Sequence, residues 1–225
     1  MTQGTMPGMA DMAMAATWTP WGIITWTLMI AMWWVMMMAM MIPSAVPAIL
    51  LYARVRDHAL KEGHGKAAST WAFAAGYLLT WLGFAIAAAA LQWSLEHAGL
   101  VSAAWMGSQN RWLSAAVLVS VGLYQLSPLK HSCLAHCRTP AAFLSRHWRP
   151  RVMGALRLGA MHGAYCVGCC WMLMTLLFVG GVMNVTWIAA LTLLVLSEKA
   201  LPVGPWVGRG AGIALLGWGL VTLIL

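Results

Sequence analysis

Long apolar segments alternate with short polar ones along almost the whole chain. A helix rises about 1.5 Å per residue, so about 20 apolar residues are enough to cross the hydrocarbon core of a bilayer. The pattern predicts an all-α, polytopic bundle of six membrane helices, with five as the alternative because the fifth segment is short. The six predicted helices cover residues 21–52, 71–93, 112–126, 158–179, 182–196 and 206–225.

The first of these segments, residues 21–52, is longer than one straight crossing requires and contains Pro43 and Pro47. Proline removes a backbone hydrogen bond, and its ring clashes with the preceding turn of a helix. We therefore expect this helix to be kinked or broken near Pro43. Residues 1–20 are predicted to form a methionine-rich exterior tail, and residues 21–225 a single transmembrane domain.

The composition excludes a separate soluble domain. Hydrophobic residues make up 62% of the chain and charged residues only 8%, whereas a soluble domain has about 25% charged residues. The net charge of +8 comes from basic residues concentrated in the loops, so we expect no nucleic-acid partner. The expected partner is the lipid bilayer.

Basic residues alternate between the connecting loops. The loops after the first, third and fifth predicted helices are basic, and the loop at 127–157 carries the most Lys and Arg residues. The turn between the fourth and fifth helices carries no charge. Because loops rich in Lys and Arg stay in the cytoplasm, both termini are predicted to be exterior and the 127–157 loop cytoplasmic.

All five cysteines fall in two short segments. The first is SPLKHSCLAHCRTP, with Cys133 and Cys137, and the second is HGAYCVGCC, with Cys166, Cys169 and Cys170. Disulfides are rare in the cytosol and five is an odd number, so we expect no disulfide between Cys133 and Cys137. His131 and His136 flank the first pair and are weaker candidates, because both could simply be solvated.

His162 precedes the second cysteine segment by one helical turn. At about 100° per residue, His162, Cys166 and Cys169 lie within roughly 60° of one another, and Cys170 lies beside Cys166. A lone buried cysteine is usually a small apolar residue. Three thiols and an imidazole on one helix face favour a ligand or redox role instead. Thiolates are soft ligands that favour Cu(I), Zn(II) or iron–sulfur clusters.

The chain holds 18 methionines, and many fall in MIAMWWVMMMAMMIPS at residues 29–44. Their spacing places them on adjoining stripes of one helix. Core packing explains such stripes, but thioether sulfur is also a soft ligand for Cu(I). The methionines of the tail at 1–20 are either part of an unselected disordered segment or a further set of ligands. The candidate ligands within the membrane are Met36, Met37, Met40 and Met41.

Several enzyme classes have no signature in this chain. There is no P-loop and no phosphorylated-aspartate motif, which excludes an ATP-driven pump on this chain, and no catalytic motif indicates an enzyme. Glu198 is the acidic residue nearest a predicted membrane segment. Because Lys199 follows it directly, we expect the two residues to form an ordinary interfacial ion pair.

Three segments resemble a bacterial family of predicted metal-binding integral membrane proteins, long described as a domain of unknown function. They are MMMAMMIPS at 36–44, YQLSPLKHSCLAHCRTP at 124–140 and LGAMHGAYCVGCCWMLMTLLFVGGVMNVTWIAALTLLVLSEK at 158–199. Some members are described as copper chaperones that help to load tyrosinase-type or oxidase enzymes. The resemblance implies a multi-pass protein of the bacterial inner membrane, with the five cysteines as suspected ligands and His162 beside them.

These patterns favour a membrane-embedded Cu(I)-binding protein that acts as a copper chaperone for a cuproenzyme of the oxidase or tyrosinase type. Zn(II) is the alternative metal. The soft donors would form a series from the exterior tail, through the methionines and the 162–170 cluster, to Cys133 and Cys137 on the cytoplasmic side. Because three ligands on one helix face suggest an incomplete site, a homo-oligomer could share it.

Two other hypotheses come from different classes of protein. The first is a thiol–disulfide oxidoreductase in which Cys133/Cys137 and Cys166/Cys169 are the exchanging pairs. The second is a non-catalytic assembly scaffold whose thiols are incidental.

Overall fold

The computed structural model describes residues 21–61, 69–102, 106–108, 110–147 and 151–224. Within these ranges the regular elements are all helices, and the only other pairing is an isolated bridge between Val101 and Ser108. The predicted all-α class is therefore confirmed. The predicted tail at 1–20 lies outside the described residues.

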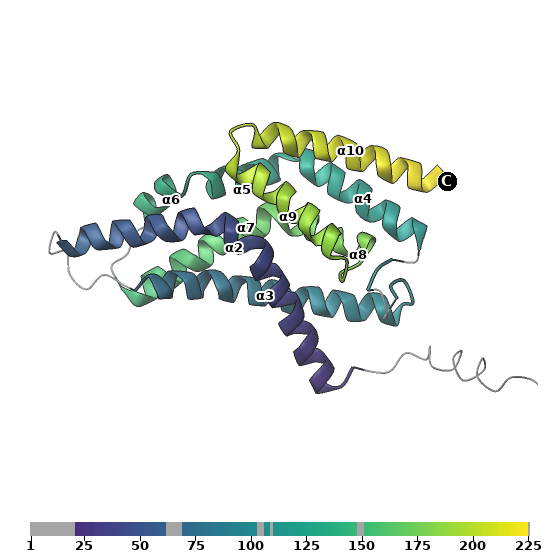
Figure 1. Cartoon of the computed structure of the whole chain (residues 1–225), viewed down its shortest axis with the longest axis horizontal. Coiled ribbons are helices and arrows are strands. Elements are labelled where there is room, and N and C mark those ends of the chain that lie inside the picture. Colours follow the sequence, from purple (N-terminus) through teal and green to yellow (C-terminus); the bar gives the residue numbers. More distant parts are fainter. Residues whose placement is uncertain (1–20, 62–68, 103–105, 109, 148–150, 225) are drawn as a thin grey trace, which may run out of the picture.

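Nine helices follow one another through the described part of the chain (Figure 1). Their bounds are α2 Ile23–Lys61, α3 Thr70–His97, α4 Arg111–Leu126, α5 Pro128–Arg138, α6 Pro140–His147, α7 Val152–Thr175, α8 Leu177–Gly180, α9 Val185–Ala200 and α10 Gly204–Ile224.

Among the described residues, four spans are long and apolar enough to cross a membrane. They are α2, α3, the consecutive helices α7 and α8, and α10, with 39, 28, 29 and 21 residues. Helices α4 and α5 meet at an angle of 62° and make a fifth span if they cross together. Helix α9 has only 16 residues, about 24 Å, which is short of the hydrocarbon thickness of about 30 Å. The predicted count of six is thus not confirmed.

Helix α2 is bent and continuous. It runs through both Pro43 and Pro47 without a break in its helical assignment, and Figure 1 shows that it changes direction part-way along its length. Proline in a helix interior removes one backbone donor and forces the preceding turn aside, which explains a bend. Two indole N–H groups attach α2 to α3: Trp33 donates to Gln92 Oε1 at 2.7 Å, and Trp34 donates to the Leu78 carbonyl at 3.1 Å.

Helices α3 and α7 pack with their backbones in close approach, and glycine makes this possible. A Cβ atom added to Gly159 would lie 1.9 Å from the Phe73 carbonyl oxygen, and one added to Gly76 would lie 2.0 Å from the Leu156 carbonyl oxygen. Small residues at helix crossings are a common way for membrane helices to pack tightly. This crossing sets the position of α7, the helix that carries three of the five cysteines.

Residues 127–157 are largely helical, which corrects the prediction of a loop. Ser127 accepts a hydrogen bond from the Lys130 N–H at 3.2 Å, and Pro128 occupies the first turn, so α5 begins with a standard cap. The helix ends at Arg138, and Pro140 starts α6. Helix α6 then covers Pro140–His147. The helical pattern was missed because polar and basic residues interrupt it.

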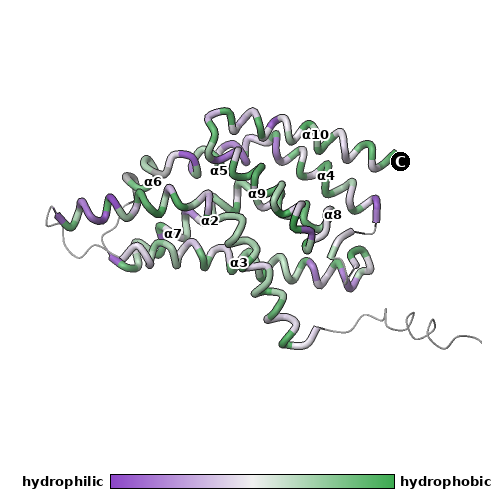
Figure 2. Tube along the Cα trace, viewed as in Figure 1, coloured by the Kyte–Doolittle hydropathy of each residue, from purple (hydrophilic) through white to green (hydrophobic). Residues whose placement is uncertain are grey.

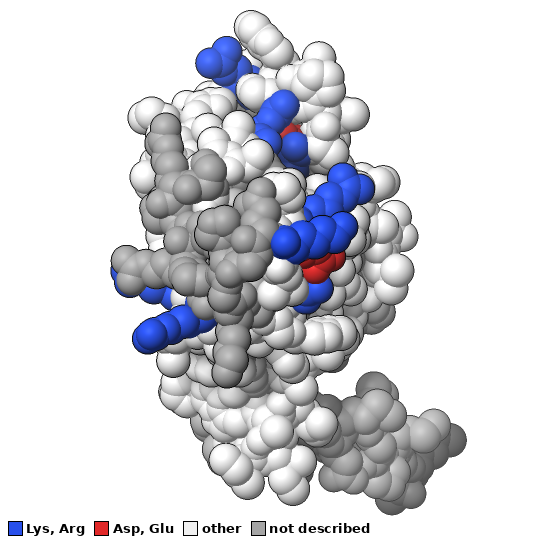
Figure 3. Space-filling model, turned by 90° about the vertical axis from the view of Figure 1, so that its left-hand side faces the viewer, with Lys and Arg blue, Asp and Glu red and all other residues white. Residues whose placement is uncertain are grey.

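The surface of the bundle suits a lipid environment. Hydrophobic residues run along α9 and α10, and hydrophilic residues gather at helix ends and around α5 (Figure 2). Exposed tryptophans stand near the starts of three helices: Trp71 is 82% exposed, Trp112 60% and Trp206 69%. Tryptophan is typical of the membrane–water interface. Lys and Arg side chains gather on the end face drawn in Figure 3.

We predict that Gly159→Ala destabilises the protein, because the added methyl group forces α3 and α7 apart. The expected cost is about 1–3 kcal/mol, the usual range for overpacking. Gly83→Ala is the matched control, since a Cβ atom there meets nothing within 4 Å. Thermal unfolding in detergent, followed by tryptophan fluorescence, measures the difference. An equal effect of the two substitutions would contradict the packing argument.

Candidate metal site

Helix α5 brings the first cysteine pair against the second cysteine segment. The Cys137 Sγ atom lies 3.9 Å from the Cys169 Sγ atom, although the two residues are 32 positions apart. The two segments were predicted to be separate steps of a series, with Cys137 at the cytoplasmic side. The structure instead joins Cys137 to the thiols of α7 in one cluster, and its cytoplasmic side stays a prediction.

The three thiols of α7 are buried side by side. Cys166, Cys169 and Cys170 are each at most 2% exposed. The Cys169 and Cys170 thiols lie 3.1 Å and 2.9 Å from the Cys166 carbonyl oxygen, and the Cys166 Sγ atom lies 3.2 Å from the Tyr77 hydroxyl group. All five cysteines are free thiols.

Helix α2 contributes a thioether to the same cluster. The Met41 Sδ atom lies 3.9 Å from the Cys170 Sγ atom, and the Met41 side chain is fully buried. Met41, a member of the predicted methionine stripe, therefore contacts a thiol of α7. Donors from α2, α5 and α7 of one chain meet here, so a second subunit is not needed to bring three helices together.

Helix α9 is the fourth helix that contributes a side chain to the cluster, through Lys199. Its Nζ atom lies 3.0 Å from the Cys166 Sγ atom, 3.3 Å from the Ser44 hydroxyl group and 4.0 Å from the Met41 Sδ atom. The predicted ion pair between Glu198 and Lys199 is wrong. Successive residues of a helix diverge by about 100°, so these two side chains point to different neighbours.

Glu198 pairs with Lys130 of α5. The Lys130 Nζ atom lies 2.6 Å from the Glu198 Oε2 atom, and the two side chains are only 2% and 3% exposed. Gln125 completes the group: its Nε2 atom donates to Glu198 Oε1 at 2.7 Å, and Lys130 donates to its Oε1 atom. This buried polar group joins the ends of α4, α5 and α9 directly beside the thiol cluster.

Cys133 and His162 lie beside this cluster, and Cys133 packs against the same core as the thiols of α7. Cys133 packs beside Gly168, where an added Cβ atom would lie 3.0 Å from its Sγ atom. The imidazole of His162 is 4% exposed and packs among aromatic rings, with the ring centres of Phe73 and Tyr77 6.1 Å and 6.0 Å away.

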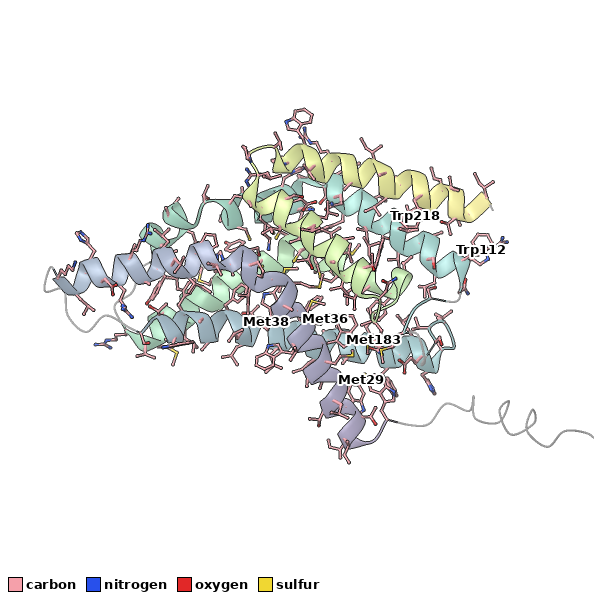
Figure 4. The ribbon with its side chains drawn as sticks, viewed as in Figure 1. Met29, Met36, Met38, Trp112, Met183 and Trp218 are labelled. Atoms are coloured by element: carbon pink, nitrogen blue, oxygen red, sulfur yellow. The ribbon has the colours of Figure 1, made fainter. Side chains whose placement is uncertain are left out.

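The remaining candidate methionines belong to α2. Met37 and Met40 are core residues, at 0% and 2% exposed, and Met36 is half-buried. Figure 4 shows Met29, Met36 and Met38 along the first half of α2, ahead of the bend. Met37 and Met40 pack in the same core cluster as the thiols of α7, and the Met41 sulfur atom lies 3.9 Å from the Cys170 sulfur atom.

The donor set fits a soft ion with few ligands. Within the described residues, no three His, Cys, Asp or Glu side chains are arranged to hold one metal ion. Two thiolates on one ion, each at about 2.3 Å, are at most about 4.6 Å apart. The 3.9 Å between Cys137 and Cys169 is within that limit. Thiolate and thioether sulfur together favour Cu(I), whereas structural zinc takes four Cys or His ligands.

The comparison with protein families decides the class. A family model named PpoB2 and described as a copper chaperone matches residues 30–222. The chain belongs to this copper chaperone family. The suspected family resemblance is therefore confirmed, and the matched residues include every cysteine and Met41. A copper chaperone implies a recipient copper protein. Searches of curated proteins and of solved structures each found no match.

Sequence reasoning missed three neighbours of the copper chaperone's thiols. Lys199 was missed because it was predicted to pair with Glu198. Ser44 was missed because it follows a proline inside an apolar helix, and Tyr77 because it lies in a uniformly apolar segment. Each reaches the cluster from a different helix. The usable signal for Lys199 was a basic residue in the last turn of an apolar helix, because an ionisable residue within a membrane segment is by default a functional-site candidate.

We predict that Lys130→Met destabilises the copper chaperone by about 3–5 kcal/mol, because it leaves the Glu198 carboxylate buried without its partner. The double variant Lys130→Met with Glu198→Gln removes both charges and should recover much of the loss. Thermal unfolding in detergent measures both effects.

The control for this prediction is the surface pair of Arg56 and Asp57. Its N–O distance is also 2.6 Å, but its side chains are 29% and 55% exposed. Arg56→Met should cost no more than about 1 kcal/mol. A loss in Lys130→Met as small as in Arg56→Met would show that the buried pair does not support the fold.

Proposed function

We propose that this chain is a membrane-embedded Cu(I) chaperone that holds the ion at a thiol–thioether cluster and delivers it to a cuproenzyme of the oxidase or tyrosinase type. The observation that carries the proposal is the 3.9 Å between the Cys137 and Cys169 sulfur atoms, on two different helices. The proposed ligands are Cys137 and Cys169, with Cys166, Cys170 and Met41 as neighbouring donors.

A gradient of exposure suggests how the ion leaves. Cys166, Cys169 and Cys170 are buried, whereas Cys137 is half-buried on α5. A partner thiol or thioether can therefore approach Cys137 before any other ligand of the proposed site. Ligand exchange through a half-exposed thiolate lets a soft ion pass to a partner without ever being free in solution. In this proposal Cys133, one turn earlier on α5, is an accessory donor.

A wide pocket lies next to Cys137 and suits a docking partner. Its lining includes His131, His136 and Arg138 of α5, Phe143 of α6 and Pro205 at the start of α10. The ring of His136 stacks on Tyr165 at 4.4 Å, which fixes the outer face of α5 against α7. A recipient domain bound at this pocket would contact His136 and Arg138, the residues that precede and follow the proposed transfer thiol in the sequence.

The proposed topology is that of a multi-pass protein of the bacterial inner membrane with both termini exterior. Its support is the gathering of Lys and Arg side chains on one end face (Figure 3). Exposed members of that end include Arg54, Lys61, Arg151 and Arg157, from the end of α2 and the start of α7. By the positive-inside rule this end belongs in the cytoplasm. Lys130 is buried and does not contribute to that charge.

We predict that an alkaline phosphatase fused after Leu225 is active in bacterial cells, because that enzyme folds only on the exterior side. A fluorescent protein fused in the 62–68 segment should instead be bright, since that segment follows the basic end of α2. Activity of the phosphatase at 62–68 together with inactivity at the C-terminus would reverse the proposed topology.

A thiol–disulfide oxidoreductase is the second candidate, and the same pair of sulfur atoms supports it. Cys137 and Cys169 are free thiols 3.9 Å apart, and a disulfide requires about 2.05 Å, so a small movement of α5 would join them. We favour the copper carrier over an enzyme, because the family is described as a copper chaperone and Met41, which cannot form a disulfide, belongs to the cluster.

We predict that Cys169→Ser and Cys137→Ser each weaken Cu(I) binding by at least about tenfold, or about 1.4 kcal/mol, because each removes a thiolate of the proposed pair. Cys133→Ser is the matched control from the same helix and should change the affinity several-fold at most. The measurement is an anaerobic titration of the detergent-solubilised protein against a chromophoric Cu(I) chelator.

The outcome separates the two candidate functions. Unchanged Cu(I) affinity in the double Cys137→Ser, Cys169→Ser variant would contradict the chaperone proposal. A mixed disulfide with a partner, trapped only when one of the two cysteines is replaced, would favour the oxidoreductase. Full activity of a chain without cysteines would favour a scaffold.

A further inference from the structure

Lys199 is the only cation whose ammonium group lies among the sulfur atoms in the described part of the chain. Its Nζ atom is 3.0 Å from the Cys166 Sγ atom and 4.0 Å from the Met41 Sδ atom, and Met41 in turn contacts Cys170 at 3.9 Å. The Ser44 hydroxyl group at 3.3 Å holds the ammonium group from the α2 side. Groups of two helices, α2 and α7, thus hold the ammonium group of Lys199 in the cluster.

No carboxylate of the described residues forms an ion pair with Lys199. The adjacent Glu198 is occupied by Lys130 at 2.6 Å and by the amide of Gln125 at 2.7 Å. Arg138 of α5 donates to the backbone carbonyls of Glu198 and Pro202 at 3.2 Å and 3.4 Å. The charge of Lys199 is therefore available to balance negative charge that develops on the thiols.

The net charge of the occupied site depends on the charge of the bound metal ion. A Cu(I) ion held by two thiolates carries a net charge of −1, and Lys199 brings the sum to zero. A Zn(II) ion held by the same two thiolates is neutral, and Lys199 brings the sum to +1. An unbalanced charge is costly in an apolar interior. Since no three described His, Cys, Asp or Glu side chains are arranged around one ion, the two-thiolate complex is the relevant one.

We propose that Lys199 is a specificity-determining residue, whose ammonium group neutralises a two-thiolate complex of a monovalent soft ion and disfavours divalent ions at the same thiols. This inference rests on the proposed function and adds the basis of metal choice. Lys199 acts through charge and through its contact with Cys166, and it is not itself a ligand. The cargo selected in this way is Cu(I) or, as a laboratory analogue of the same charge, Ag(I).

The test compares three variants of the full-length chain in detergent under anaerobic conditions. Lys199→Met removes the charge and keeps the length of the side chain, Lys199→Arg keeps the charge, and Ser44→Ala keeps the lysine and removes its hydroxyl partner. Competition against chelators gives the Cu(I) and Zn(II) dissociation constants of each protein. The quantity compared is their ratio, which does not depend on the fraction of folded protein.

The expected result is that Lys199→Met shifts the ratio by at least about tenfold toward Zn(II), while Lys199→Arg and Ser44→Ala stay within about threefold of the wild type. Ag(I) should follow Cu(I), because the two ions share one charge. An unchanged ratio in Lys199→Met, or an equal shift in Lys199→Arg, would overturn the inference.

The control on the wild type separates this inference from the proposed function. If wild-type protein binds Cu(I) with the expected dependence on Cys137 and Cys169, the Lys199 variants decide the inference alone. If wild-type protein binds no Cu(I), the proposed function fails, and the role of Lys199 fails with it.

Discussion

Charge balance in an apolar interior is the constraint on which this structure depends. Only 8% of the residues are charged. In the described part of the chain, the buried Lys130 and Glu198 pair with each other, and the half-buried Lys199 contacts a thiol. Lys130 meets Glu198 at 2.6 Å, and Lys199 meets the Cys166 sulfur at 3.0 Å. An uncompensated ion in such a place costs several kcal/mol, so these contacts fix the end of α9 against α5 and α7.

The close crossing of α3 and α7 makes the cluster possible. Glycine at positions 76 and 159 leaves no room for a methyl group between the two backbones. Helix α7 also packs against α4, α5 and α9. The thiols lie on this helix, where the half-buried Cys137 and the buried Met41 reach them. Rigid helix packing therefore places soft donors from three helices in one small volume, with an ammonium group beside them.

Soft ligands in a low-dielectric site suit the transport of a reactive monovalent ion. Sulfur atoms bind Cu(I) without the hard oxygen ligands that attract Mg²⁺ or Ca²⁺, and exclusion of water protects the ion from side reactions. Membership of a copper chaperone family agrees with this chemistry.

Periodicity and composition were enough to predict the helical class and most of the long helices, because these depend on residues close together in the sequence. The resemblance of the cysteine motifs likewise predicted the family. Tertiary structure decided which segments meet. Cys137 contacts Cys169 because α5 folds as a helix within a segment that was predicted to be a loop. Glu198 pairs with Lys130, which is 68 positions before it, while the next residue, Lys199, contacts the thiols. Such pairings rest on contacts between distant segments, which no local pattern encodes.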